Sequence, residues 1–414
     1  MEINTVGVIG LGYIGLPTAA ILASKGVKVV GVDVKPSTVE AVNRGEVPFV
    51  EPDLAREVAG AVQQGTLRAT DTPEPADAFI VAVPTPFQGD HEPDLSCIEE
   101  AAKALAPQLR GGELLVLEST SPPGATRAMA EWVLEARPDL SLDGADGRPQ
   151  IHVAHCPERV LPGRVMIELV TNDRIVGGLT SEAARLAKDL YAVFCQGKIL
   201  LTDAVTAEMA KLVENSYRDV NIAFANELSL IADKVGVDVW ELIRLANHHP
   251  RVNILQPGPG VGGHCIAVDP WFLVDAAPEQ ARLVRTAREV NDSKPQWVVD
   301  KAVAAVEGIE APTIAALGLA FKADIDDLRE SPARRIVAEL ADRLPQAQIL
   351  AVEPHVRELP EDLAGRGNVV LKDLDQIWGA DVTIVLVDHS DFRTALAGDA
   401  IRRTSVIDTR GVLA

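Results

Sequence analysis

The feature that most constrains this chain is a glycine turn between two strand-like segments. Gly10, Gly12 and Gly15 form a G-x-G-x-x-G pattern that follows an apolar run at residues 5–10 and opens a helical stretch at 16–25. The glycines permit a tight turn and a close approach of backbone N–H groups to a pyrophosphate, whose negative charge the helix N-terminus stabilises. The pattern predicts a dinucleotide-binding βαβ unit.

Asp33, which ends the second strand-like run, bears on which dinucleotide fits. Its carboxylate would accept hydrogen bonds from the ribose hydroxyls of adenosine and would repel a 2′-phosphate. The sequence therefore predicts NAD as the cofactor, bound by Gly10, Gly12, Gly15 and Asp33. The alternative is a plain turn beside a surface aspartate, which the strand–turn–helix context disfavours.

The alternation of short β-branched runs with helical stretches predicts the fold class. Strands are expected at residues 5–10, 27–33, 78–83, 114–119 and 151–155, with helices such as 16–25 and 98–109 between them. This rhythm is typical of a parallel sheet with helices on both faces. After Pro312 it restarts, with strands expected at 313–317, 348–352, 382–387 and 405–408.

The middle of the chain has a different pattern. Residues 203–235 contain neither Pro nor Gly, and apolar residues recur there at helical spacing, which predicts one long helix that connects domains and packs against a second subunit. A further helix is expected at 280–290, after an irregular loop at 256–263. We thus expect an α/β protein with two Rossmann-like doubly wound domains, joined by a central helical region with one long helix. The expected domains are residues 1–200, 201–305 and 306–414.

Polar residues in two loops and on the long helix are candidates for chemistry. Thr85 and Thr120 lie in loops after apolar strands, at the sheet edge where ligands bind in such folds, although the prolines there could simply end the strands. Lys211, Asn215 and Arg218 share one helix face. A solvated face would explain these three residues, but a lysine and an asparagine one turn apart also suit acid–base work on an oxygen.

Cys265 ends a glycine-rich loop, an unusual place for a structural cysteine. A nucleophilic thiolate needs a partly exposed, electropositive position, whereas a packed and inert thiol is the alternative. Adjacent side chains seldom converge on one ion, so His264 and Cys265 do not predict a metal site.

Charge and cysteine usage exclude several classes of protein. The net charge of −21 disfavours nucleic acid and anionic membrane surfaces as partners, so an anionic ligand would need local arginines and lysines. The four cysteines are widely spaced and form no CxxC pair, and no signal peptide or membrane-spanning run is evident. A cytoplasmic location is expected.

Six motifs together resemble the UDP-glucose/UDP-N-acetylmannosamine dehydrogenase family over essentially the whole chain. They are GLGYIGLP, ESTSPPG, CPERVLPG, AEMAKLVENSYR, GGHCIAVDPWF and GLAFKADIDDLRESP. The cysteine loop is similar to the UDP-N-acetyl-D-mannosamine branch. Enzymes acting on UDP-glucose typically have Ser before the cysteine and Pro-Lys before the aspartate, where this chain has His264, Ala267 and Val268.

The resemblance implies a four-electron oxidation of the C6 alcohol of a UDP-sugar, here UDP-N-acetyl-D-mannosamine, to the uronate with two NAD⁺. Cys265 would attack the intermediate aldehyde, and the thiohemiacetal would be oxidised to a thioester that water hydrolyses. The implied catalytic residues are Cys265, Lys211, Asn215, Asp269, Glu158 and Thr120, with Lys211 as acid–base and Glu158 and Thr120 acting on the water.

The resemblance also implies contacts and an assembly. The further cofactor positions are Tyr13, Ile14, Thr85, Thr126 and Arg329. The implied substrate positions are Arg159, Val160, Lys211, Asn215, Arg218, His249, Arg251, Gly262, Phe321, Lys322 and Arg410. Family members are usually homodimers through the central helices, and we expect His249 and Arg251 to act across the interface.

Other functions remain to be separated by experiment. A β-hydroxyacid dehydrogenase shares the Lys and Asn but oxidises once and needs no thiol. An epimerase ordinarily relies on Tyr-x-x-x-Lys, which none of the three tyrosines supplies. A non-catalytic nucleotide-sugar or NAD-binding protein would release no NADH. Within the dehydrogenases, UDP-N-acetylglucosamine and UDP-glucose are the alternative substrates.

Overall fold

The computed structural model describes residues 3–49, 51–89, 91–161, 163–263, 265–377, 379–396 and 405–413. Its contacts divide the chain into two compact units, Met1–Glu214 and Asn215–Ala414. No helix in these ranges combines the length and the apolar character needed to cross a membrane.

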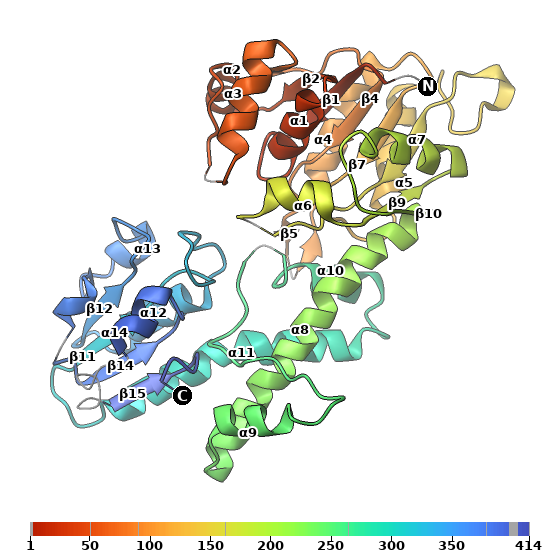
Figure 1. The fold of residues 1–414 in the computed structure, drawn as a ribbon. Helices are drawn as coiled ribbons and strands as arrows, with labels where there is room; N and C mark the ends of the chain where they lie inside the picture. The colour runs from red at the N-terminus through yellow and green to blue at the C-terminus, as the bar shows by residue number, and fades with distance from the viewer. Residues whose placement is uncertain are drawn as a thin grey trace. The chain divides into compact units, whose positions relative to one another are not determined.

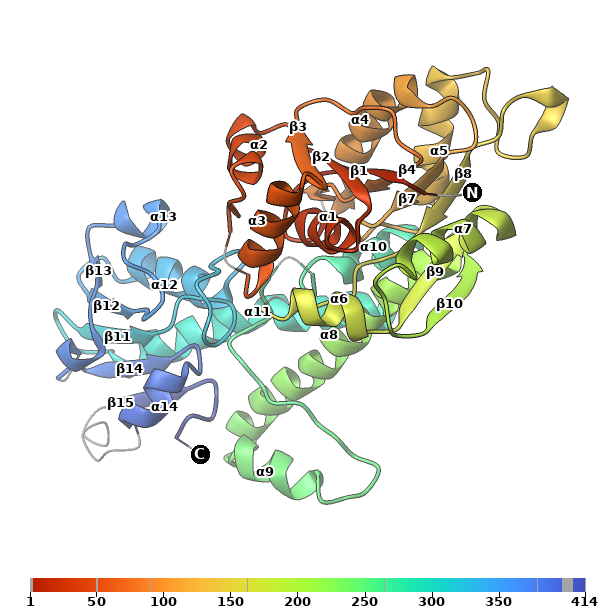
Figure 2. The same cartoon turned by 45° about the horizontal axis from the view of Figure 1, so that its top comes forward.

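The first unit (Figure 1) is built on an eight-stranded sheet in the order β10-β9-β8-β7-β4-β1-β2-β3, whose strands are all labelled in Figure 2. Its strands are β1 (Thr5–Ile9), β2 (Lys28–Val32), β3 (Leu67–Thr70), β4 (Ala78–Val81), β7 (Leu114–Leu117), β8 (His152–His155), β9 (Arg174–Gly178) and β10 (Ile199–Asp203). The reversal of strand order beside β1 and β4 is the switch point at which ligands bind in such sheets.

Helices cover both faces of this sheet (Figure 2), and for this reason β4 and β7 are buried throughout and uniformly apolar. One face packs against α1 (Gly15–Ser24), α2 (Pro36–Asn43), α3 (Leu54–Gln64), α6 (Val165–Thr171) and α7 (Ser181–Tyr191). The other packs against α4 (Ser96–Leu105) and α5 (Ala125–Ala136). A small hairpin, β5 (Phe87–Gln88) and β6 (Glu92–Pro93), follows β4.

The five strands expected in this sheet are parallel as predicted, and the unpredicted β3 joins them in parallel, but one edge of the sheet differs. β9 pairs antiparallel with β8, and β10 runs parallel to β9, so these two strands oppose the rest. Neither was predicted. β9 begins with the charged Arg174, and β10 exposes Leu200 and Leu201 in succession, so neither strand shows the usual alternation.

The long helix is α8 (Ala204–Val235), which confirms the expected helix at 203–235. The second unit continues with α9 (Val239–Ala246), α10 (Asp269–Ala276) and α11 (Arg282–Ala305). α11 extends well beyond the predicted 280–290 and contains Pro295. Its polar residues Asn291 and Lys294 are buried against α8, where Lys294 donates to Ser229, so tertiary contacts sustain a helix that the proline and polar pattern seemed to end.

The second sheet has the order β13-β12-β11-β14-β15, and its strands are all parallel. They are β11 (Thr313–Leu317), β12 (Gln348–Val352), β13 (Val369–Leu371), β14 (Val382–Val385) and β15 (Ser405–Asp408). One face packs against α11, α12 (Pro332–Arg343) and α13 (Glu361–Ala364), and the other against α14 (Ser390–Leu396). Two Rossmann-like sheets and a central helical region confirm the predicted fold class.

The two sheets share a local construction. Gly10 follows β1 with φ +93°, and Gly318 follows β11 with φ +97°. A Cβ on Gly318 would lie 2.3 Å from Cβ of Val387. In both sheets an acidic side chain at the end of the neighbouring strand accepts a hydrogen bond from the turn. Leu11 N donates to Asp33 after β2 at 3.0 Å, and Leu319 N donates to Glu353 after β12 at 2.7 Å.

We predict that Gly318→Ala destabilises the protein more than Gly308→Ala does. Both positions have positive φ, which costs an alanine about 1–2 kcal/mol, but no atom lies within 4 Å of a Cβ on Gly308. The clash at Gly318 should add about 1–3 kcal/mol. Urea unfolding followed by circular dichroism measures both losses, and equal losses would contradict the close packing at Gly318.

Candidate active site

The glycine turn of the first unit has the geometry of a pyrophosphate cradle. A Cβ on Gly10 would lie 2.5 Å from the carbonyl oxygen of Ala82, and one on Gly15 would lie 1.8 Å from that of Gly10. Gly12 has no atom within 4 Å of a Cβ position, so the space above it is open. The environment of Gly10 suits a tight turn, that of Gly15 suits close packing of the helix, and that of Gly12 lets the backbone approach a phosphate. The residues of the turn therefore fit NAD.

The residues beside the turn are held by side-chain contacts. Tyr13 stacks on Phe49 with ring centroids 4.3 Å apart, and Ile14 lies immediately before α1. Asp33 is half-buried and accepts from Leu11 N and Lys35 N, at 3.0 and 2.9 Å. Each carboxylate oxygen keeps a second lone pair for a ribose hydroxyl.

The two predicted threonine loops lie side by side after β4 and β7. Thr85 donates its hydroxyl to the carbonyl of Thr120 at 2.6 Å, and Ser119 donates to the carbonyl of Val83 at 2.6 Å. Thr85 and Thr120 are half-buried. The structure thus brings these two predicted residues together at the carboxyl ends of the strands.

Thr126, expected at the cofactor, is fully buried at the start of α5. Its hydroxyl and backbone N–H both donate to Glu208 of α8, at 2.5 and 2.7 Å, and Gly124 N donates to the same carboxylate at 2.7 Å. Burial raises the pKa of Glu208, and these hydrogen bonds oppose the rise. The contact of Thr126 is therefore with α8.

Glu158 is buried, and burial raises its pKa while the nearby ammonium of Lys211 opposes that shift. Its carboxylate also accepts from the backbone N–H of Val160. Lys211 is 7% exposed, so the predicted polar face of α8 is not a solvated one at this position. A buried carboxylate within the electrostatic influence of a buried lysine suits proton transfer.

Arg159 is occupied by protein groups. Its guanidinium binds Glu214 of α8, with Nε–Oε2 at 3.0 Å, and donates to the carbonyl of Asp173 at 3.0 Å. A substrate anion at Arg159 would compete with Glu214.

In the second unit, Cys265 is half-buried at the start of a turn that leads into α10. Val268 N and Asp269 N donate to its carbonyl at 3.0 and 2.8 Å. Asp269 is 2% exposed and accepts from the side-chain amide of Asn215. Three of the predicted residues thus form one construction, in which α8 holds the turn that presents the sulfur. His264 lies outside the described residues.

The thiol of Cys156 provides a contrast. It is fully buried, and burial raises its pKa to about 11, so it is not a nucleophile at neutral pH.

The loop before Cys265 packs against predicted substrate residues of the last domain. A Cβ on Gly262 would lie 2.9 Å from Cβ of Phe321, and one on Gly258 would lie 2.8 Å from a guanidinium nitrogen of Arg410. Arg410 is held by Asp388, with Nη2–Oδ1 at 2.7 Å. The structure therefore gathers Gly262, Phe321 and Arg410 beside the cysteine loop.

Five predicted residues have exposed side chains: Arg218, His249, Arg251, Lys322 and Arg329. The side chain of Arg329 pairs with Asp327, at Nη2–Oδ2 2.6 Å, and its carbonyl accepts from Gly263 N at 3.3 Å. The solvent-exposed side chains of Arg218, His249, Arg251 and Lys322 leave room for a ligand or a partner chain.

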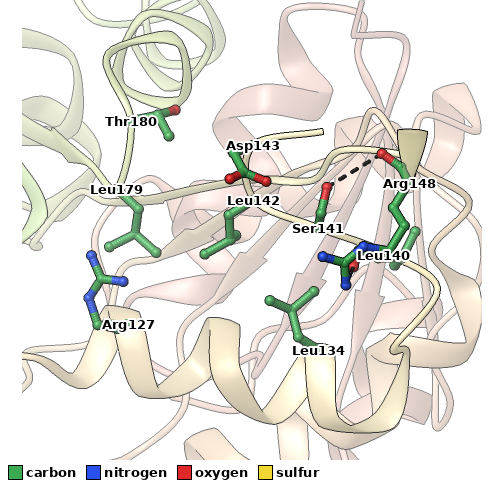
Figure 3. Close-up of a pocket in the computed structure, with 9 residues that line it drawn as sticks. All are labelled: Arg127, Leu134, Leu140, Ser141, Leu142, Asp143, Arg148, Leu179 and Thr180. Carbon is green, nitrogen blue, oxygen red and sulfur yellow. Dashed lines mark hydrogen bonds between the residues drawn. The ribbon is translucent and has the colours of Figure 1, made fainter. Parts of the chain in front are cut away.

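A pocket of about 340 Å³ lies elsewhere in the first unit (Figure 3). Residues of α5, of the 140–148 segment and of the turn after β9 line it, among them Arg127, Arg148 and Leu179. The segment precedes β8 and so lies at the amino ends of the strands, whereas ligands in such sheets bind at the carboxyl ends. None of the predicted site residues lines this pocket.

Five acids that hold site residues, or that lie in and bind the loops and turns near them, were not predicted from the sequence. They are Glu208, Glu214, Glu118, Glu353 and Asp388. Glu208 could have been found, because it lies one helical turn before Lys211 on the same helix. The other four give no local signal, since an acid near a strand end or on a helix is ordinary.

Comparisons with known proteins cover the whole chain. Residues 4–195, 205–293 and 315–414 match the NAD-binding, central and UDP-binding domains of the UDP-glucose/GDP-mannose dehydrogenase family. UDP-N-acetyl-D-mannosamine dehydrogenase of Escherichia coli K12 is 56% identical over 422 residues, with both chains fully covered. NDP-N-acetyl-D-galactosaminuronic acid dehydrogenase of Ralstonia nicotianae is 56% identical over 413 residues, covering 100% of this chain and 97% of the relative. The structure of UDP-D-ManNAc dehydrogenase from Pyrococcus horikoshii has a TM-score of 0.87 at 39% identity, covering 99% and 96% of the two chains.

We predict that Gly12→Ala weakens NAD binding without destabilising the fold. The added methyl group meets no protein atom within 4 Å but occupies space that the pyrophosphate needs. The Kd for NAD⁺, measured by calorimetry, should rise at least ~10-fold, or about 1.4 kcal/mol, with an unchanged melting temperature. Gly60→Ala, also unobstructed, is the control. Unchanged NAD⁺ affinity in Gly12→Ala would contradict the assignment of the cradle.

Proposed function

The chain belongs to the UDP-glucose/GDP-mannose dehydrogenase family, and we propose that it oxidises C6 of UDP-N-acetyl-D-mannosamine to the carboxylate, giving UDP-N-acetylmannosaminuronate. It is an NAD-dependent oxidoreductase. The observation that carries the proposal is the hydrogen bond between Asn215 of α8 and Asp269, which fixes the turn of Cys265. A single oxidation would not require such a presented thiol.

NAD⁺ would supply the oxidising power for both oxidations by taking up hydride. The glycine turn at Gly10, Gly12 and Gly15 and the carboxylate of Asp33 would hold it. Lys211 takes the hydroxyl proton as the alcohol becomes an aldehyde. Cys265, having lost its thiol proton to water, adds as a thiolate to the carbonyl carbon, and the oxygen receives a proton from Lys211. Lys211 takes that proton back when the thiohemiacetal is oxidised to the thioester.

The last step breaks the thioester. Glu158 takes a proton from water while the water oxygen attacks the acyl carbon, and Thr120 orients that water. The C–S bond breaks, the sulfur leaves as a thiolate, and the sugar C6 is released as a carboxylate. Burial raises the pKa of Glu158, which makes it a stronger base than an exposed glutamate. Asn215 orients the reacting oxygen, and Asp269 fixes Asn215.

The UDP portion binds in the second unit. Phe321 and Lys322 contact it, and Arg410 donates charge-assisted hydrogen bonds to the diphosphate beside Gly262. Arg159, Val160, Arg218, His249 and Arg251 complete the substrate contacts, and Thr85 and Arg329 complete those to the cofactor. Thr126 acts on the cofactor site only through Glu208 of α8, which holds it. A reducing cytoplasm is the proposed location, because Cys265 must remain a thiol.

A second candidate substrate is UDP-N-acetyl-D-galactosamine. The identity to the galactosaminuronate enzyme of Ralstonia nicotianae equals the identity to the mannosamine enzyme of Escherichia coli, at 56%. The mannose and galactose configurations differ at C2 and C4, away from C6, so the same chemistry serves both sugars.

The chain is proposed to act as a homodimer through its central helices. Within the second unit, α8 exposes Tyr217, Phe224, Ile231 and Val235, which are 73%, 52%, 50% and 65% exposed. Their spacing of seven, seven and four residues places them along one stripe of the helix. An exposed apolar stripe of this length suits a self-complementary contact with a second copy, in which His249 and Arg251 serve the partner's site.

We predict that NADH release across UDP-hexoses and their N-acetyl derivatives is fastest with UDP-N-acetyl-D-mannosamine. Cys265→Ser should lower turnover at least ~100-fold, about 2.7 kcal/mol of barrier, because a serine hydroxyl adds poorly to the aldehyde and leaves poorly from the acyl group. Cys97→Ser is the matched control and should keep wild-type turnover. Wild-type turnover in Cys265→Ser would rule out the covalent step, and no NADH with any sugar would favour a binding protein.

We predict that Phe224→Glu produces a monomer, because the dimer would bury the new carboxylate without a charged partner in the centre of an apolar interface. Sedimentation equilibrium measures the mass. Leu283→Glu changes a residue of α11 that is 68% exposed and should leave the dimer intact. A wild-type monomer, or a Phe224→Glu dimer of unchanged affinity, would refute the proposed interface.

A further inference from the structure

The core of the first unit contains a polar cluster that the proposed mechanism does not use. Glu118, Cys156, Arg174 and Tyr191 are each at most 6% exposed and are surrounded by apolar side chains. Burying a charged pair is often no more favourable than packing apolar residues of the same volume. A structural role alone therefore gives little reason for these residue types.

Arg174 makes the central contacts of the cluster. Its Nη1 lies 3.7 Å from Glu118 Oε1 and donates to the sulfur of Cys156 at 3.7 Å, and its Nη2 donates to the carbonyl of Leu169 at 3.4 Å. The guanidinium also lies over the Tyr191 ring, 4.7 Å from its centroid. Tyr191 donates its hydroxyl to Glu118 at 3.3 Å. One side chain thus holds residues from two different loops.

The two residues that Arg174 holds are in equivalent places. Glu118 is the first residue after β7, and Thr120 follows it by two positions. Cys156 is the first residue after β8, and Glu158 follows it by two positions. The loops are also joined directly, because Glu158 N donates to the carbonyl of Glu118 at 3.4 Å.

The residues just before Arg174 hold the second loop as well. Asn172 donates its side-chain amide to the carbonyl of Arg159 at 3.1 Å, and Arg159 donates to the carbonyl of Asp173 at 3.0 Å. Residues 172–174 therefore contact the chain on both sides of Glu158, at the sulfur of Cys156 and at the carbonyl of Arg159.

The cluster is not arranged for maximal stability. Arg174 Nε is buried without a hydrogen-bond partner among the described residues, which costs folding free energy. Burial raises the pKa of Glu118 to about 7, against the influence of Arg174. Unsatisfied buried groups of this kind are typical of functional sites rather than of a packed core.

We propose that Arg174 and Glu118 are positioning residues for the hydrolytic step, holding Thr120 and Glu158 where they direct water onto the acyl group. This inference rests on the proposed function. The two residues touch neither substrate nor cofactor. Substitutions at Arg174 or Glu118 that break their contacts should impair hydrolysis of the thioester and leave the steps that form the thioester largely intact.

The test compares Glu118→Gln and Arg174→Met with the wild type under single-turnover and steady-state conditions. Both variants should retain the initial burst of NADH, while steady-state turnover falls ~10- to 100-fold. Intact-protein mass spectrometry should then show a sugar–acyl adduct on the enzyme, because hydrolysis has become the slow step. Arg174→Lys keeps the positive charge and should restore part of the rate lost in Arg174→Met.

The controls separate this inference from the proposed function. Arg185→Met changes an exposed arginine of α7 that pairs with Glu182 and Asp189, and it should behave as wild type.

If Arg174→Met does not fold, the near-isosteric Glu118→Gln decides the question. Wild-type turnover in Glu118→Gln, or an equal loss of burst and turnover without adduct, overturns the positioning role. Either result leaves the proposed function standing if Cys265→Ser is inactive, whereas wild-type turnover in Cys265→Ser overturns both.

Discussion

The glycine turns after β1 and after β11 depend on the same kind of interaction. In each sheet, a carboxylate at the end of the neighbouring strand, β2 or β12, accepts a backbone N–H group of the turn. Without the carboxylate, this N–H group would be unpaired. Asp33 does this in the first sheet, at 3.0 Å from Leu11 N, and Glu353 in the second, at 2.7 Å from Leu319 N. The two acids differ in what remains available. Asp33 is half-buried, whereas Glu353 is 4% exposed and also pairs with His389. Only the first has an accessible carboxylate for a ribose.

The charge of the chain sets a second constraint. With a net charge of −21, an anionic sugar nucleotide has to be held by local cations. Several of the candidate cations are already paired with acids: Arg410 with Asp388 and Arg159 with Glu214. These pairs hold the guanidinium groups in fixed positions, so little side-chain entropy is lost when a diphosphate replaces or joins the carboxylate. Acidic residues thus prepare the site for an anion instead of only repelling it.

Local sequence pattern predicted the elements that local forces decide. β11, β12 and β15 have the expected bounds, and α8 begins one residue after the expected start. The pattern missed β9 and β10 and the second half of α11, because burial of Arg174 and Lys294 depends on partners far along the chain. In the site, the glycine turn and the cysteine loop were recognisable. The contact of Thr126 with Glu208 was not, because the two residues are 82 positions apart.

The central claim is that one chain carries out two successive oxidations of the same carbon, with Cys265 holding the sugar between them. The most direct measurement is the ratio of NADH formed to UDP-sugar consumed by the wild-type enzyme, with spectrophotometry for the first and chromatography for the second. We expect two NADH for each sugar and a uronate as the only product. One NADH for each sugar, with the aldehyde released, would contradict the two-step oxidation.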